Sequence, residues 1–147
     1  MAEWDLARAR PEDLGEALEL LERCDLPREG VAESFGHFVV ARQAALLVGL
    51  AGLESCGPDA LLRSLAVAPS HRGRGLGLEL LRRALELAPL TGARDVYLLT
   101  TTARDFFLRH GFVDCPRDQA PLAVRASWEF SQGCPTTSAF MRLARRP

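Results

Sequence analysis

The chain has 147 residues, of which 48% are hydrophobic and 25% charged, and its formal net charge is -1. This size and composition predict one soluble globular domain over residues 1–147 and exclude a disordered chain. The near-neutral charge excludes a broad basic surface for nucleic acid, and no apolar run reaches the length of a membrane-spanning helix. Because residues 1–13 lack a signal-peptide pattern, we expect a cytoplasmic protein with no membrane partner.

The first half of the sequence predicts strands arranged around a single long helix. Residues 4–9 (WDLARA) alternate weakly and form a candidate first strand. Pro11 then opens a predicted helix in which leucine and alanine recur at helical spacing as far as Leu21. Three further apolar stretches predict strands, at residues 37–42, 45–55 and 60–69.

The second half predicts alternating helices and strands. The stretch at residues 76–88 has an apolar face and a charged face, so it predicts an amphipathic helix that ends before Pro89. A strand, a short helix ending at Gly111 and a last strand follow, at residues 93–101, 102–112 and 137–144. This order predicts an α/β protein with a mixed sheet and a parallel crossover over residues 61–100.

A glycine- and arginine-rich turn, SHRGRGLG at residues 70–77, lies between a predicted strand and a predicted helix. Free backbone N–H groups at a helix start bind anions, and glycines let a phosphate approach the backbone. A P-loop is excluded because Leu78 and Glu79 stand where lysine and serine or threonine are needed. A dinucleotide-binding turn is excluded because its third glycine is missing, which leaves the pattern R-x-x-G-x-G.

The segment LAVAPSHRGRGLGLELL resembles the acetyl-CoA-binding motif of the GNAT superfamily of N-acetyltransferases. The resemblance implies a GNAT fold, a central, mixed, mostly antiparallel twisted sheet of six to seven strands with helices on both faces. It also implies that acetyl-CoA is the co-substrate and that the Val67 N–H polarises the thioester carbonyl. The implied coenzyme-binding residues are Leu65, Ala66 and Val67 along the pantetheine arm, and Arg72, Gly73, Arg74, Gly75, Leu76 and Gly77 around the pyrophosphate.

Two further segments, VYLLTTTARDFF and SWEFSQGCPTTSAFMRL, narrow the resemblance. They are similar to the arsenic-resistance-operon N-acetyltransferases and to the acetyltransferase domain of N-acetylglutamate synthases. This similarity implies a small amine acceptor, an amino acid or an amino-acid-like compound. It also implies that the segment around Trp128 and the loop at residues 24–33 lie near the acceptor; the alternative for Trp128 and Phe130 is a flap that covers the core.

The general acid and the general base are the least defined parts of the predicted site. Phe107 occupies the position at which many GNAT enzymes place a tyrosine that serves as the general acid, so we expect Phe107 only to line the pocket. A hydroxyl of Thr100 or Thr101 is then the candidate to assist the departure of the thiolate. Leu61 occupies the usual position of a catalytic glutamate. We therefore take Glu54 as the candidate base, and a solvated strand-end carboxylate is the alternative. His37 and His110 are weaker candidates.

Arg63 interrupts a strand that should be buried, and a buried guanidinium needs an anion. It is either a clamp for the carboxylate of the acceptor or the partner of Glu54 or Asp59 in a fixed ion pair. Strand alternation predicts that Arg63, Leu65 and Val67 share one face.

Two other function classes stay open at the level of sequence. The absence of the usual tyrosine and glutamate favours a non-catalytic acetyl-CoA-binding module that acts as a sensor or partner protein. Four scattered cysteines suggest, as a further hypothesis, a metalloid-binding protein. Their spacing, however, predicts reduced, packed thiols and no metal site. The edge strands of such a sheet could pair with a second copy of the chain, so a homodimer is a further possible state.

Overall fold

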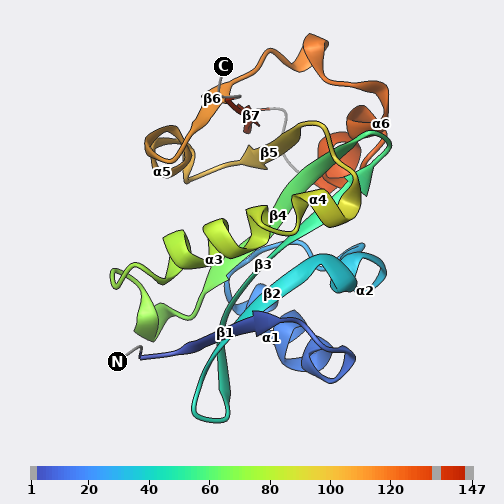
Figure 1. Ribbon diagram of the computed structural model, residues 1–147. Coiled ribbons are helices and arrows are strands. Elements are labelled where there is room, and N and C mark those ends of the chain that lie inside the picture. The colour runs from blue at the N-terminus through green and yellow to red at the C-terminus, as the bar shows by residue number, and fades with distance from the viewer. Residues whose placement is uncertain (1–2, 134–136, 145–147) are drawn as a thin grey trace.

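A computed structural model describes residues 3–133 and 137–144 (Figure 1). Its strands form one seven-stranded sheet in the order β1-β2-β3-β4-β5-β7-β6. Among the described residues, β4 and β5 pair in parallel and all other neighbours pair antiparallel, which confirms the predicted mixed sheet. The strands are β1 (Asp5–Arg8), β2 (Phe38–Gln43), β3 (Leu46–Cys56), β4 (Asp59–Val67), β5 (Val96–Thr100), β6 (Phe112–Asp114) and β7 (Ala139–Leu143).

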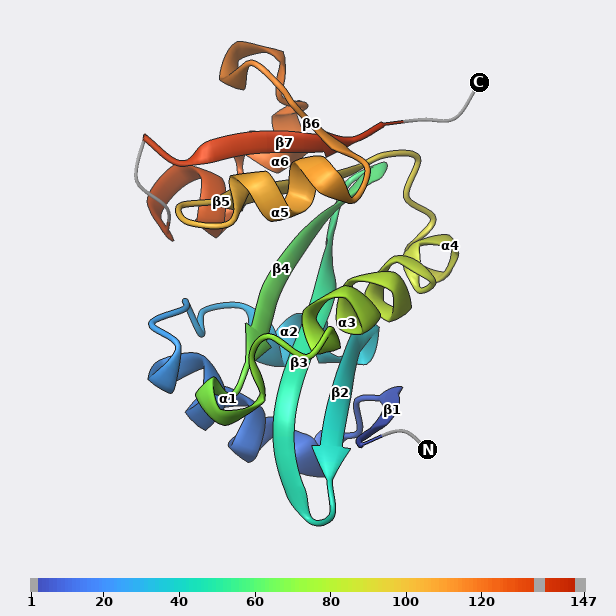
Figure 2. The same ribbon diagram turned by 90° about the vertical axis from the view of Figure 1, so that its left-hand side faces the viewer.

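Helices cover both faces of the sheet, as predicted (Figure 2). One face carries α3 and α5, and the other carries α1, α2 and α6. No helix among the described residues is long and apolar enough to cross a membrane. The helices are α1 (Leu14–Arg23), α2 (Val31–Ser34), α3 (Leu76–Leu85), α4 (Ala88–Thr91), α5 (Arg104–Arg109) and α6 (Leu122–Arg125). Short turns are η1 (Pro11–Asp13), η2 (Phe35–His37), η3 (Pro69–His71) and η4 (Arg117–Gln119), and η5 (Glu129–Gly133) is π-helical.

The predicted long helix at residues 76–88 is two helices in the structure. The first, α3, ends at Leu85, and Pro89 lies in the first turn of α4. Strand β6 has three residues and was not predicted, because so short a stretch carries too little alternation to be recognised.

The backbone of β4 bulges at Ser64, which has a φ of 63°. Leu50 pairs with Ala66, but Gly52 pairs with Arg63, so β4 holds one extra residue across this part of the ladder. Directly paired residues project to the same face. A Cβ on Gly49, the partner of Val67, would meet Leu80 of α3, whereas a Cβ on Gly52 would meet Phe38 on the opposite face.

The bulge therefore separates side chains that simple alternation puts together. Arg63 projects to the face of α1 and α2, and Val67 projects to the face of α3. The prediction that Arg63 and Val67 share a face is wrong, because one extra residue in a strand reverses the facing of everything beyond it.

Strands β4 and β5 are joined over a short distance and then part. Their parallel ladder comprises Ala60–Leu62 paired with Val96–Leu98. Beyond this point β4 continues to Val67 alongside β3, while β5 turns away toward β7 (Figures 1 and 2). The sheet is thus split into a wedge on the carboxyl side of this ladder.

We predict that Gly52→Ala lowers the free energy of unfolding by about 2–3 kcal/mol, because overpacked cores lose stability of this order. A Cβ at Gly52 would lie 2.1 Å from the ring of the fully buried Phe38. The matched control is Gly15→Ala in α1, where a Cβ meets nothing within 4 Å. We expect this control to raise stability by about 0.5 kcal/mol, since alanine is the better helix former. Urea unfolding measures both, and equal effects of the two substitutions would contradict the packing argument.

Candidate active site

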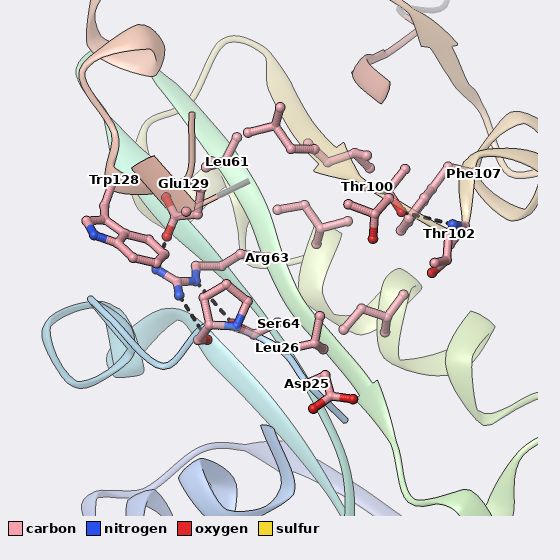
Figure 3. Close-up of a pocket in the computed structure, with 18 residues that line it drawn as sticks. Asp25, Leu26, Leu61, Arg63, Ser64, Thr100, Thr102, Phe107, Trp128 and Glu129 are labelled. Carbon is pink, nitrogen blue, oxygen red and sulfur yellow. Dashed lines mark hydrogen bonds and ion pairs between the residues drawn. The ribbon is translucent and has the colours of Figure 1, made fainter. Parts of the chain in front are cut away.

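A cavity of about 360 Å³ lies in the wedge between β4 and β5 (Figure 3). Its walls come from residues 61–65 of β4, residues 98–103 of β5 and the following turn, and residues 25–27 after α1. Phe107 of α5, Trp128, and Glu129 and Gly133 of η5 complete the wall. The loop after α1 and the segment around Trp128 therefore both reach the cavity.

The cavity brings together five of the residues predicted to act at the site: Arg63, Leu65, Thr100, Thr101 and Phe107. In Figure 3, Thr100 and Phe107 lie on the opposite side of the cavity from Arg63 and Glu129. The hydroxyl oxygen of Thr100 accepts a hydrogen bond from the Ala103 N–H at 3.0 Å and so holds the turn into α5. Glu54, Val67, His37 and His110 do not line the cavity.

The glycine–arginine turn presents a set of free backbone donors. Gly73 and Gly75 have φ angles of 78° and 87°, in the left-handed region that glycine adopts without strain. Gly75 is the N-cap of the ten-residue helix α3. Within the described part of the chain, the N–H groups of residues 73–78 form no hydrogen bond. Together with the positive end of the helix dipole, these donors form a site suited to a phosphate.

The two arginines of this turn are engaged elsewhere. The Arg72 Nε donates to the Val67 carbonyl oxygen at 3.1 Å, and its Nη2 lies 3.5 Å from the Cys24 sulfur. Arg74 forms an exposed ion pair with Glu3 at 3.3 Å. In this structure the free donors of the turn are therefore backbone groups, and the side chains of Arg72 and Arg74 have other partners.

The end of β4 directs one backbone amide into the wedge. The Ala68 N–H donates to the Val48 carbonyl of β3 at 2.8 Å. Because successive residues of a strand point their backbone groups to opposite sides, Val67 points its N–H and C=O away from β3. By the same alternation Ala66, paired with Leu50, faces β3. A backbone contact along the wedge therefore fits Val67, and the prediction of such a contact does not fit Ala66.

An ion cluster of one arginine and two glutamates closes the inner wall of the cavity. The Arg63 Nη1 donates to Glu54 Oε1 at 2.8 Å and also contacts the Glu129 carboxylate. The Arg63 side chain is 4% exposed, that of Glu129 is 6% exposed and that of Glu54 is 20% exposed. Arg63 thus has the fixed ion pair with Glu54 that the sequence raised as one alternative. Asp59, the other candidate, instead accepts from the Asp95 N–H at 3.2 Å.

Burial and charge shift the titration of this cluster. Burial raises the pKa of Glu129 to about 7, and the nearby Glu54 carboxylate acts in the same direction, while Arg63 opposes both. The contact with Glu129 was not predicted from the sequence, because it joins residues far apart in the chain. The available signal was an acidic residue between two aromatic ones, Trp128 and Phe130.

The thiols show no arrangement for metal binding among the residues described. Cys24, Cys56 and Cys115 are free, and burial raises the pKa of Cys56 to about 12. No three His, Cys, Asp or Glu side chains within residues 3–133 and 137–144 gather as metal ligands. Cys134 lies outside the described residues.

Comparison with known proteins relates the chain to one family. The acetyltransferase (GNAT) domain family matches residues 34–114. An amino-acid acetyltransferase of Azotobacter vinelandii is 30% identical over 131 residues, which are 83% of this chain and 30% of that protein. Another, of Photobacterium profundum, is 29% identical over 108 residues, which are 71% of this chain and 24% of that protein. The chain spans less than a third of the length of these curated relatives.

Solved structures share the fold over nearly the whole chain. Rv2747 from Mycobacterium tuberculosis, in a complex that includes CoA, has a TM-score of 0.80 at 23% identity and covers 97% of this chain and 99% of its own. N-acetylglutamate synthase from Neisseria gonorrhoeae, complexed with coenzyme A and N-acetyl-glutamate, has a TM-score of 0.80 at 22% identity. The match covers 99% of this chain and 36% of the synthase.

We predict that Glu129→Gln stabilises the protein at pH 8 but not at pH 5. The folded-state pKa of Glu129 is raised from 4.5 to about 7, so the folded protein binds this proton more tightly than the unfolded chain. Stability from this group is therefore lost as the pH rises through that interval, by about 1–3 kcal/mol. Urea unfolding from pH 5 to 8 should show the wild type losing this amount relative to the variant. Glu19→Gln on the exposed side of α1 is the control, and an identical pH dependence in all three proteins would refute the prediction.

Proposed function

Because the chain belongs to the acetyltransferase (GNAT) domain family, we propose that it transfers the acetyl group of acetyl-CoA to the amine of a small molecule. We propose further that residues 1–147 form a single domain of this type. The observation that carries the proposal is the row of free N–H groups at residues 73–78, placed at the mouth of a wedge that leads into a cavity. A coenzyme has an anionic pyrophosphate for the donors and an extended arm for the wedge.

The residues present fit this coenzyme. The N–H groups of residues 73–78 would hold the pyrophosphate, and the backbone of β4 near Leu65 and Val67 would align the pantetheine arm. The Val67 N–H, directed away from β3, would polarise the thioester carbonyl and stabilise the oxyanion that forms when the amine attacks. The coenzyme supplies the activated acetyl group, and the cavity orients the acceptor amine toward it.

The proposed reaction needs no strong general acid. Phe107 has no proton to give, and its ring packs edge-on against Phe106 and Phe112 at centroid distances of 5.2 and 5.5 Å. The leaving group is a thiolate, whose conjugate thiol has a pKa of about 8.5, so it departs without a dedicated proton donor. Thr100 and Thr101 line the cavity, as does Thr102, and a hydroxyl of Thr100 or Thr101 would assist the departure of the thiolate.

The proposed base is Glu54, acting through a water molecule. Glu54 lies behind Arg63 and does not line the cavity, so direct contact with the amine does not fit this structure. A bridging water would carry the proton from the attacking amine to the carboxylate.

The narrower acceptor class we propose is an amino acid or an amino-acid-like compound. The names of the curated relatives, amino-acid acetyltransferases, support this class. Arg63 at the cavity wall supports it as well, because a guanidinium suits a carboxylate. A role in arsenic resistance rests on the sequence resemblance alone. The cytoplasmic location and the homodimer likewise stay predictions from the sequence.

The proposed activity is tested by thiol release from acetyl-CoA in the presence of a panel of amino acids and other primary amines. We expect acetyl-CoA to raise the melting temperature and at least one amine to release free thiol and appear acetylated by mass spectrometry. A raised melting temperature without turnover on the whole panel would favour a non-catalytic acetyl-CoA-binding module. No binding of CoA or acetyl-CoA at millimolar concentration would refute both.

We predict that Gly75→Ala weakens acetyl-CoA binding about tenfold, because forcing alanine into the left-handed region costs about 1–2 kcal/mol and displaces the donor N–H groups. Gly92→Ala is the matched control. Gly92 also has a positive φ, 74°, and a Cβ at either glycine meets nothing within 4 Å. Isothermal calorimetry should show weaker binding for Gly75→Ala alone, although both variants lose similar stability. Equal affinities would contradict the proposed pyrophosphate site.

A further inference from the structure

One guanidinium serves two carboxylates at the inner wall of the cavity. The Arg63 Nη1 holds both Glu54 Oε1, at 2.8 Å, and the carboxylate of Glu129. The remaining groups of Arg63 are also engaged, Nε with the Ser64 hydroxyl at 3.1 Å and Nη2 with the Pro27 carbonyl at 3.4 Å. The bond to Pro27 is the longest, so Nη2 is the least firmly held part of the guanidinium.

The space around Arg63 is closed on one side and open on the other. A Cβ on Gly30, in the loop before α2, would come within 3.0 Å of Arg63 Nη1, so the loop packs directly against the guanidinium. Arg63 and Glu129 also both lie in the wall of the cavity. Figure 3 shows Arg63 between Glu129 and Ser64 at the edge of this space. The packed loop leaves the guanidinium no free space on its own side, while the cavity gives a ligand access to it.

The charges of the cluster do not balance when both carboxylates are ionised. Two negative groups then face a single positive one, in surroundings where an unpaired charge is costly. Among the described residues, the charged groups that face Glu129 are Arg63 of β4 and Glu54 of β3, and the nearby thiol of Cys56 stays protonated because burial raises its pKa. Asp25 lines the same cavity, and it is not among the groups that shift the pKa of Glu129. Burial is the main cause of the raised pKa of Glu129; Arg63 opposes it, and the Glu54 carboxylate adds to it.

Arg63 is also the one cation among the described residues that line the cavity. An acceptor that carries a carboxylate needs a cation there, and in this structure both glutamates already occupy it. The carboxylate of the acceptor and that of Glu129 therefore compete for the same guanidinium. Protonation of Glu129 by solvent removes its charge and decides this competition in favour of the acceptor.

We propose that Glu129 is a specificity-determining residue that competes for Arg63 and admits a carboxylate-bearing acceptor when it is protonated. The inference rests on the proposed function, since it concerns the acceptor of the same site. It makes carboxylate binding and proton uptake a single linked equilibrium. It also makes Glu129 an obstacle to acidic acceptors above neutral pH, whereas an amine without a carboxylate needs no such exchange.

The test is the affinity of the CoA complex for a panel of L-amino acids that includes L-glutamate, with the corresponding carboxamides, and for L-glutamate the diamide, as probes that lack any carboxylate. For the wild type we expect the dissociation constant of the carboxylate probes to rise about tenfold from pH 6 to pH 8, the linkage expected for one group that titrates near pH 7. Calorimetry in buffers of different ionisation enthalpy should show uptake of about one proton on binding at pH 8. In Glu129→Gln the affinity at pH 8 should be tighter by about tenfold and independent of pH, and the carboxamides should respond to neither change.

Asp25→Asn is the matched control for the general electrostatic field. It removes a negative charge from the cavity wall without touching Arg63, and asparagine tolerates the left-handed φ of 56° at this position. We expect it to keep the pH dependence of the wild type. The inference is wrong if Glu129→Gln keeps that dependence, if Asp25→Asn abolishes it, or if no amino acid of the panel binds the Glu129→Gln complex. Thiol release with acetyl-CoA judges the proposed acetyl transfer separately, so the two can fail independently.

Discussion

The left-handed backbone of Ser64 is the constraint on which the site depends. Serine adopts this conformation at a cost, and the register of β3 against β4 shifts there by one residue. The shift directs Arg63 to one face of the sheet and Val67 to the other, and it lies where β4 parts from β5. Val67, proposed to contact the coenzyme, and Arg63, proposed to contact the acceptor, therefore point to opposite faces of the sheet because of one irregular residue.

Burial decides the electrostatics of the cluster around Arg63. A second arginine, Arg42, also pairs with two carboxylates, Asp13 and Glu16. There the hydrogen bond from Arg42 lowers the pKa of the half-exposed Glu16, as an ion pair in water should. At Arg63 the same ratio of charges has the opposite result, because desolvation of Glu129 outweighs the attraction of the guanidinium. Asp13, the other partner of Arg42, has a side chain that is only 4% exposed, yet hydrogen bonds from the Arg10 N–H and from Arg42 lower its pKa despite its burial. Burial without such hydrogen bonds therefore distinguishes Glu129 from the carboxylates around Arg42.

The sequence predicted those features that depend on local pattern. Alternation and helical spacing located most elements, and the glycines of residues 73–77 indicated an anion site because few other roles need them. The bulge could not be predicted from the sequence, because a serine in a strand does not indicate a positive φ. The partner of Arg63 was only half predicted, because Glu54 is its neighbour in a hairpin whereas Glu129 arrives from a distant, π-helical segment. Long-range contacts of this kind are set by how the whole chain packs.

The short parallel ladder between β4 and β5 has a mechanical consequence. Three residue pairs join the sheet of β1–β4 to that of β5–β7, and α3 and α4 form the covalent link between them. A molecule bound in the wedge would contact both halves at the place where β4 and β5 no longer pair with each other. The hydrophobic core already joins the two halves, because Leu98, Phe107 and Met141 pack in one cluster with side chains of β1–β4. A ligand in the wedge would add contacts between halves that the core already unites, and it would raise the free energy of unfolding of the whole.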